Sequence, residues 1–352
     1  MTITGTPALR WARANLFNSP LNGVLTLLVA YLLLRLLPGF VDWALIKASW
    51  SAPNDRACQA AGGACWAFIV DWFRFIIFGR YPYAEQWRPA IVLLIFVMLL
   101  LASFDRRLGG RWLALTWLVG LGGVVSLMWG GILGLPYVET ELWNGLPLTL
   151  ILAAGGLGLS FPLALLLALG RRSTLPAVRM LSVLYIEIAR GVPFIAWLFL
   201  MLVLLPLFLP PGLTIGKLWR AEIAFALFIA AYVSEVVRGG LQAIPRGQYE
   251  AADALGLGYW KKMRLIVLPQ ALTITIPAQV NTFIGAFKDT TLISIIGLFD
   301  PMLDTNTALN DPAWRMAYVE GYVFIAALYF AFGYCMSLYS RRLEKSLGLG
   351  RR

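Results

Sequence analysis

Residues 250–269 read Glu-Ala-Ala-Asp-Ala-Leu-Gly-Leu-Gly-Tyr-Trp-Lys-Lys-Met-Arg-Leu-Ile-Val-Leu-Pro. This stretch is polar and basic, yet apolar runs long enough to cross a bilayer lie on both sides of it. Its pattern predicts a short helix, a break at Gly256 and Gly258, and a second segment opened by Lys261 and Lys262. Composition alone is compatible with an ordinary loop between two membrane helices, so the order of the residues must carry any further conclusion.

The order of residues in this loop resembles the signature loop of ABC-transporter permease subunits. The positions that carry the resemblance are Glu250, Ala251, Ala252, Gly256, Ile266, Leu268 and Pro269. In that family the loop forms a coupling helix that sits in a groove of a separate ATP-hydrolysing subunit. The resemblance therefore implies that residues 246–258 contact an ABC ATPase dimer. It also implies that ATP and Mg are bound by that partner and that this chain binds no cofactor.

The composition indicates an all-α integral membrane protein. Of the 352 residues, 60% are hydrophobic and 13% are charged, and the mean hydropathy is +0.75. A soluble domain cannot cover so much apolar surface, whereas a lipid membrane solvates it. The net charge of +11 comes largely from basic residues in short loops. This distribution fits the positive-inside rule better than a nucleic-acid partner.

Catalytic chemistry by this chain is not expected. The chain has no histidine, which is the commonest general base and a frequent metal ligand. It also lacks G-x-G-x-x-G, Walker A and G-x-S-x-G motifs and any cluster of Cys and His. We therefore expect no catalytic residue, no metal site and no enzymatic activity. A membrane-embedded enzyme is a less favoured alternative, and a channel lacks a filter-like segment.

Eight apolar segments predict about eight transmembrane helices. Their approximate ranges are 21–37, 89–103, 112–133, 146–169, 180–209, 221–237, 264–287 and 318–339. The fifth is too long for one simple span of ~20 residues, and Pro193 predicts a break near Gly191. Pro269 and Pro277 predict interruptions of the seventh. Residues 66–78 predict an amphipathic helix at the membrane interface.

The basic residues predict the orientation of the chain. With both termini on one side, 18 Lys and Arg fall on that side and 9 on the other. The positive-inside rule then predicts a multi-pass membrane protein with both termini in the cytoplasm, and the resemblance implies the bacterial inner membrane. Cys58 and Cys65 fall in the long loop on the periplasmic side. A disulfide can form in that oxidising compartment, and two free cysteines are equally compatible with the sequence.

Further segments resemble polar amino-acid permeases. They are Glu187-x-x-Arg190-Gly191-x-Pro193, Lys288-Asp289-Thr290-Thr291-Leu292-x-Ser294-x-Ile296-Gly297 and Ser340-Arg341-Arg342-Leu343-Glu344. The added N-terminal region is similar to the larger permease subunits of general L-amino-acid (Aap-type) and glutamate/glutamine/aspartate (Bzt-type) importers. The resemblance implies import of polar L-amino acids together with a sister permease and a periplasmic amino-acid-binding protein. Trp197 and Asp300 depart from the pattern, which leaves substrate contacts at these positions undetermined.

This resemblance predicts three regions. Residues 1–140 form an N-terminal extension with three spans and a long periplasmic loop. Residues 141–345 form the ABC importer permease core from the last five helices, with the cytoplasmic coupling loop at 241–264. Residues 346–352 form a basic cytoplasmic tail.

Five residues are candidates for the translocation path: Glu187, Arg190, Pro193, Lys288 and Asp289. An ionisable residue at a helix centre costs roughly 2.5–3.5 kcal/mol on insertion scales, so it must be paired or wetted. Glu187 and Arg190 are three residues apart and are predicted to pair with each other, either as a structural ion pair or as part of the path. A secondary transporter is the alternative function, although no internal repeat supports it.

Overall fold

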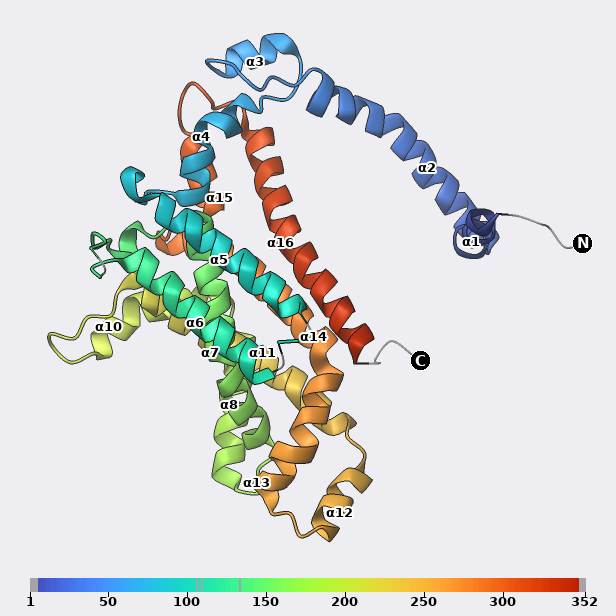
Figure 1. The fold of residues 1–352 in the computed structure, drawn as a ribbon, viewed down its shortest axis with the longest axis vertical. Helices are drawn as coiled ribbons and strands as arrows, with labels where there is room; N and C mark the ends of the chain where they lie inside the picture. The colour runs from blue at the N-terminus through green and yellow to red at the C-terminus, as the bar shows by residue number, and fades with distance from the viewer. Residues whose placement is uncertain (1–5, 106, 109, 133, 348–352) are drawn as a thin grey trace, which may run out of the picture. The chain divides into compact units, whose positions relative to one another are not determined.

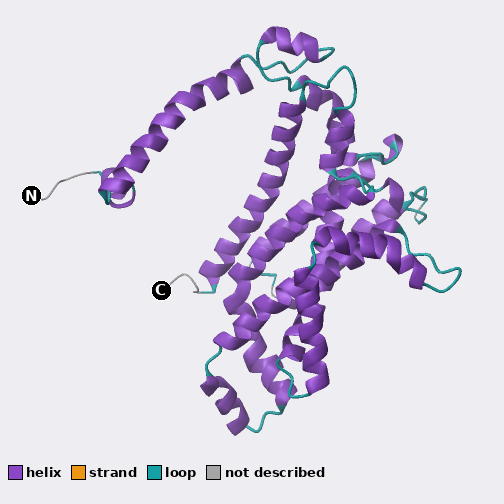
Figure 2. Cartoon of the chain, turned by 180° about the vertical axis from the view of Figure 1, so that it is seen from behind, coloured by secondary structure: helices purple, strands orange, loops and turns teal. Residues whose placement is uncertain are grey.

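The computed structural model describes residues 6–105, 107–108, 110–132 and 134–347. Figure 2 shows these residues as helices joined by loops, without a strand among them. The α-helices are α1 (Pro7–Asn15), α2 (Pro20–Val41), α3 (Asp55–Ala61), α4 (Ala67–Phe78), α5 (Trp87–Phe104), α6 (Gly110–Trp129), α7 (Gly145–Arg171), α8 (Pro176–Gly191), α9 (Phe194–Phe199), α10 (Leu205–Phe208), α11 (Lys217–Ala243), α12 (Arg246–Ala254), α13 (Tyr259–Lys262), α14 (Leu268–Asp289), α15 (Pro301–Ala308) and α16 (Tyr318–Ser346). The all-α prediction is confirmed.

The number of membrane spans also agrees with the prediction. Among the described residues, 7 continuous helical segments are long and apolar enough to cross a membrane, and a bent pair raises this to 8. The bent pair is α8 with the segment Phe194–Phe208, which turns by 108°. Val192 and Pro193 are extended between the two arms, so the break lies next to Gly191 as predicted. Figure 1 shows the helices in chain order by colour.

One predicted interruption is wrong. Pro277 lies inside α14, which continues without a break to Asp289. Pro269 sits in the first turn of α14, directly after a π-helical turn at Met263–Val267. A π turn accommodates a residue that cannot donate to the ordinary ladder, and membrane helices tolerate proline when neighbouring groups satisfy the freed carbonyl.

The chain divides into two compact units. Unit 1 contains the N-terminal residues up to Asp71 and the segment Leu309–Gly321, and unit 2 contains Trp72–Ala308 and the residues from Tyr322 onward. This division by compactness differs from the predicted boundary at residue 140. That boundary rests on family resemblance and stays a prediction.

Unit 1 joins the loop after α2 to the segment before α16. The backbone N–H of Asp55 donates to the carbonyl of Ala313 at 2.8 Å, and the N–H of Met316 donates to Asp55 Oδ2 at 3.1 Å. The N–H of Cys65 donates to Glu320 Oε1 at 2.8 Å. Cys58 and Cys65 form a disulfide with their Cα atoms 5.3 Å apart. The structure thus has the bonded alternative of the two that the sequence left open.

Unit 2 is packed around α11 through small residues. A Cβ atom added at Gly240 would lie 2.6 Å from the carbonyl oxygen of Ala271 on α14. One added at Gly156 on α7 would lie 2.1 Å from the ring of Phe225 on α11. Because such contacts need glycine, α7, α11 and α14 approach one another closely. This three-helix core positions both candidate sites.

Candidate functional site

The predicted short helix of the loop is α12. Pro245 precedes its first residue, and Gly256 follows its end with a left-handed φ of +71°. The N–H of Leu257 donates to the carbonyl of Ala252 at 3.1 Å, and the N–H of Gly256 donates to that of Asp253 at 2.9 Å. These two bonds are the Schellman arrangement that ends helices at glycine. Figure 1 shows α12 and α13 together at one end of unit 2, beside the beginning of α14.

The two faces of α12 differ in exposure. Ala252 is fully buried and Tyr249 is half-buried against the chain itself. Glu250, Ala251 and Gly256 are exposed, and the side chain of Leu255 is 74% exposed. Ala252 is therefore covered by the chain itself, and its part in ATPase coupling stays a prediction.

Side-chain contacts tie α12 to the membrane helices. Lys262 Nζ lies 2.5 Å from Asp253 Oδ1, and Gln270 Nε2 on α14 donates to Gln248 Oε1 at 3.1 Å. Arg172, at the end of α7, donates Nη1 to the Tyr249 hydroxyl at 3.3 Å and to the carbonyl of Leu241 on α11 at 2.9 Å. Thus α12 is connected to α7, α11 and α14.

The remaining positions of the loop motif are Ile266, Leu268 and Pro269, which lie around the beginning of α14. Ile266 and Leu268 are half-buried in and after the π turn, while Pro269 is exposed. Val267, between them, is fully buried. The apolar residues at the end of the loop motif therefore anchor the loop to the core of unit 2.

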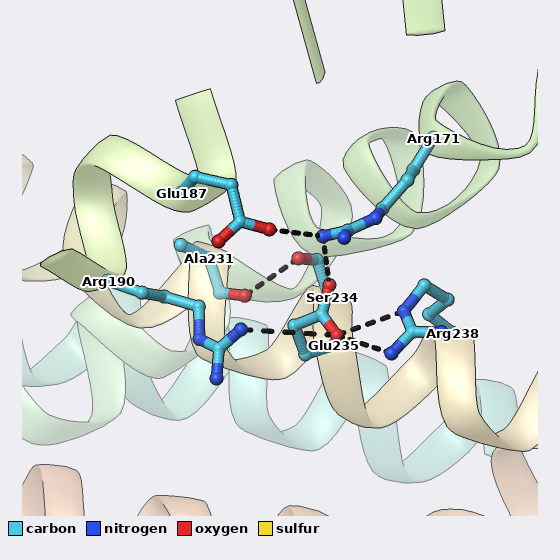
Figure 3. A network of polar contacts seen from close by, with 7 residues as sticks. All are labelled: Arg171, Glu187, Arg190, Ala231, Ser234, Glu235 and Arg238. Atoms are coloured by element: carbon cyan, nitrogen blue, oxygen red, sulfur yellow. Dashed lines mark hydrogen bonds and ion pairs between the residues drawn. The ribbon is translucent and has the colours of Figure 1, made fainter. Parts of the chain in front are cut away.

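A network of ionised side chains joins α7, α8 and α11 (Figure 3). Its centre is Glu235, whose Oε1 lies 2.5 Å from Arg171 Nη1 and whose Oε2 lies 2.7 Å from Arg238 Nη2. Arg190 Nη1 lies 4.0 Å from Glu235 Oε2, and its guanidinium lies over the ring of Tyr232. Glu187 Oε1 lies 3.1 Å from Arg171 Nη1. Three arginines therefore face two carboxylates.

The contacts in this network contradict one predicted ion pair and show where the residues predicted for the translocation path lie. Glu187 pairs with Arg171 on α7, and Arg190 pairs with Glu235 on α11, so the predicted pair between Glu187 and Arg190 is wrong. Helical spacing allowed that pair, but arginine and glutamate partners on neighbouring helices lie closer. Pro193 lies exposed at the bend between α8 and α9.

Lys288 and Asp289 do not join this network. They end α14, 20 residues and about 30 Å of helix beyond its loop-side beginning at Leu268. Glu235 lies near the loop-side end of α11 instead. The five predicted path residues therefore fall into two groups, toward opposite ends of the core.

Sequence reasoning missed several residues of these sites. Arg171 and Arg172 ended an apolar run and signalled only a boundary, because their partners are distant in the chain. Glu222 on α11 is 95% buried, with its Oε1 within 2.3 Å of where a Cβ at Gly155 would lie. Neither of its carboxylate oxygens has a hydrogen-bond partner among the residues described. A carboxylate near the beginning of a mainly apolar span was the available signal.

A second missed pair lies outside the spans. Asp300 precedes α15 and accepts hydrogen bonds from the N–H of Leu303 at 3.0 Å and from the Tyr329 hydroxyl at 3.1 Å. Asp304 is fully buried, and within the described part of the chain neither of its oxygens has a hydrogen-bond partner. Burial, and then the nearby charge of Asp300, raise the pKa of Asp304 to about 9. Folding therefore favours its neutral form.

We expect Asp304→Asn to make the protein less sensitive to alkaline pH. The pKa of Asp304 lies above its ordinary value of 3.8. Its contribution to stability is thus full below about pH 4 and is lost as the pH rises toward 9, at up to roughly 1.4 kcal/mol for each pH unit. Asparagine cannot ionise. The melting temperature of Asp304→Asn minus that of the wild type should therefore increase from pH 5 to pH 9.

The exposed Glu141 provides the matched control for this measurement. In Glu141→Gln, the difference in melting temperature from the wild type should stay nearly constant over the same pH range. A constant difference for Asp304→Asn as well would show that Asp304 is not held neutral by folding.

Comparison with known proteins identifies the family. Residues 160–348 match the family model described as the binding-protein-dependent transport system inner membrane component. The chain is 48% identical over 347 residues to the inner membrane amino-acid ABC transporter permease protein YhdY of Escherichia coli, covering 98% of this chain and 94% of that protein. It is 38% identical over 408 residues to the glutamate/glutamine/aspartate/asparagine transport system permease protein BztC of Rhodobacter capsulatus, covering 97% and 94%.

A solved structure supports the same family assignment. The crystal structure of an amino acid ABC transporter with histidines matches at 31% identity and a TM-score of 0.51, covering 57% of this chain and 92% of that chain. The fold and the loop define a permease subunit of the ABC type, a transport component and not an enzyme. The chain belongs to the family of binding-protein-dependent transport system inner membrane components and is a multi-pass inner membrane protein. Membership of this ATPase-coupled class excludes the alternative of a secondary transporter.

Proposed function

We propose that this chain is a permease subunit of an importer for polar L-amino acids, driven by ATP and Mg bound on a separate ABC ATPase dimer. The relatives named above carry amino-acid transport in their descriptions, which supports this substrate class. The observation that carries the coupling is the attachment of α12. Its outward face presents Glu250, Ala251 and Gly256, while its inward face is bonded to three membrane helices.

In this proposal α12 passes motion from the ATPase to the core. Nucleotide binding closes the ATPase dimer and displaces the groove that holds residues 246–258. The links through Asp253, Gln248 and Tyr249 then move α13, α14 and α7 together. Because Arg172 joins the end of α7 to the end of α11, both ends follow the displacement of α12. The permease thereby exchanges inward-open and outward-open states.

The ion-pair network supplies a site for the carboxylate of the substrate. Three guanidiniums against two carboxylates leave one unit of positive charge. Arg190 is held most loosely, at 4.0 Å, and its side chain is 39% exposed. We therefore assign Arg190 to the translocation path. Glu187 and Pro193 are assigned to position its side chain. Lys288 and Asp289 are assigned to the opposite end of the path.

Arg190→Ala should reduce uptake at least tenfold while leaving the assembled complex intact. The reason is that Arg171 and Arg238 still neutralise Glu235 when Arg190 is absent. The check is uptake of radiolabelled amino acid by cells, together with the yield of complex in detergent. Leu181→Ala, exposed on the same helix and outside the network, is the control. A parallel loss of complex and uptake would assign Arg190 a structural role.

The proposed orientation places both termini in the cytoplasm and the long loop that carries Cys58 and Cys65 in the periplasm. It also places the exposed surface of α12 on the side of the ATPase and leaves the opposite side to a periplasmic amino-acid-binding protein. The similarity to BztC over nearly the whole chain supports a sister permease as the second membrane subunit.

The disulfide provides a test of this orientation. In a Cys335→Ser background, a membrane-impermeant maleimide should label Cys58 and Cys65 in intact spheroplasts only after reduction. Sealed inside-out vesicles should resist labelling under the same conditions. Labelling without reduction would show free thiols, and labelling confined to inside-out vesicles would reverse the topology.

The test of the function as a whole is affinity purification of the tagged chain from native membranes. We expect an ABC ATPase and a second permease to co-purify. The reconstituted complex should take up polar L-amino acids only with ATP and the binding protein. Recovery of the chain alone would contradict the proposed assembly, and ATP-driven uptake of another solute would contradict the substrate class.

A further inference from the structure

A groove lies beside the coupling loop, where α7 ends and α8 begins. Its volume is about 650 Å³, within the usual range for small-molecule sites. Its floor is apolar and formed by Leu166, Leu169, Val178 and neighbouring side chains. Its polar lining comes mainly from the connection 172–174, which is called the polar end below. The groove therefore has both an apolar and a polar lining.

The apolar floor belongs to the membrane-spanning part of the chain. Leu166 and Leu169 lie in the last two turns of α7, inside a 27-residue segment long enough to cross the bilayer. Tyr259 and Trp260 border the groove, and their side chains are 47% and 70% exposed. Exposed aromatic residues are typical of the boundary between membrane and water. An occupant must therefore have one part in hydrocarbon and one part at this boundary.

The polar end carries positive charge in a defined geometry. Arg179 donates Nε and Nη2 to the carbonyl of Ser173 at 2.9 and 2.7 Å, which fixes the connection. In the part of the chain that the structure describes, both hydrogen bonds of Arg172 use Nη1, which leaves Nε and Nη2 for a ligand.

We propose that this groove binds one anionic phospholipid. The acyl chains lie along the leucines of α7 and Val178, and the phosphate contacts Arg172, Ser173 and Thr174. Basic pockets between membrane helices at this boundary suit anionic headgroups. A soluble protein segment does not meet the requirement for the floor, because Leu166 and Leu169 belong to an apolar helix long enough to cross the membrane.

The site connects lipid to the coupling loop. Arg172 is the residue that holds Tyr249 of α12 and Leu241 of α11. A phosphate on its free nitrogens orients the guanidinium for both contacts. Occupancy should therefore stabilise the loop in the conformation described above.

The experiment is native mass spectrometry of the complex purified from its membranes, followed by exchange into phosphatidylglycerol or phosphatidylcholine nanodiscs. Val178→Trp fills the floor, and Thr174→Glu places a negative charge at the exposed polar end. Leu184→Trp, on the exposed side of α8 away from the groove, is the matched control. We expect one retained phosphatidylglycerol in the wild type and Leu184→Trp, and at least tenfold lower occupancy in the two groove variants.

The melting temperature should follow the same pattern. Phosphatidylglycerol should raise it above the value in phosphatidylcholine for the wild type and Leu184→Trp only. Equal occupancy of the two lipids, or unchanged occupancy in Thr174→Glu, would overturn the proposal. A photo-crosslinking residue at Trp260 that captures a protein subunit and no lipid would also overturn it. Thr174→Glu keeps the test decisive if Val178→Trp does not fold, because Thr174 is exposed.

Discussion

Gly256→Glu is expected to lower uptake about a hundredfold, equivalent to roughly 2.7 kcal/mol of lost coupling, with a parallel loss of the co-purifying ATPase. Two effects combine at this position. A left-handed φ of +71° strains any L-residue by roughly 1–2 kcal/mol. The new side chain also projects from the exposed end of α12, where no atom of the described residues, apart from the two chain neighbours, lies within 4 Å of an added Cβ. Bulk and charge therefore meet the partner and not the chain itself.

Two further substitutions separate these effects. Gly256→Asn adopts the left-handed conformation more readily and should keep most of the docking. Gly256→Ala has the strain without the bulk and should lie between Asn and Glu. The measurement is the ratio of ATPase to permease after affinity purification, with uptake in the same cells. Wild-type stoichiometry and uptake in Gly256→Glu would remove residues 246–258 from the interface.

Glu235→Ala is expected to be the most destabilising change in the ion-pair network. Its loss leaves Arg171, Arg190 and Arg238 facing only Glu187. Removing one partner of a buried ion pair costs about 3–5 kcal/mol. The Glu235 and Arg171 side chains here are 16% and 25% exposed. Solvent screening therefore reduces our expectation to roughly 2 kcal/mol.

Glu187→Ala is the matched control, because its side chain is 56% exposed and has one arginine partner. It should cost at most about 1 kcal/mol, as surface pairs do. The melting temperatures and yields of the purified complexes give the comparison. Equal losses in the two variants would contradict a network centred on Glu235.

The sequence predicted the helices, the broken span and the location of α12 because these depend on local signals. Apolar length specified the spans, proline specified the break, and Gly256 specified the end of α12 through its conformational freedom. The loop motif predicted a helix, but not that Ala252 would face inward.

The partners of the charged residues could not be predicted from the sequence, because they depend on how the helices pack. Glu187 has a helical neighbour at Arg190, yet Arg171 and Glu235 from adjacent helices took their places. The same reason hid Asp304, whose burial depends on the packing of α15 within unit 2. The two cysteines were close in the chain, but only the fold of their loop brought their sulfur atoms together.

The 108° bend between α8 and α9 has a consequence for hydration. The last carbonyls of one helix and the first N–H groups of the next lack intrahelical partners. Hydrocarbon cannot satisfy such backbone groups, so a broken span is stable only where it borders protein or a water-filled cavity. The backbone around Val192 therefore borders protein or water and does not face the lipid.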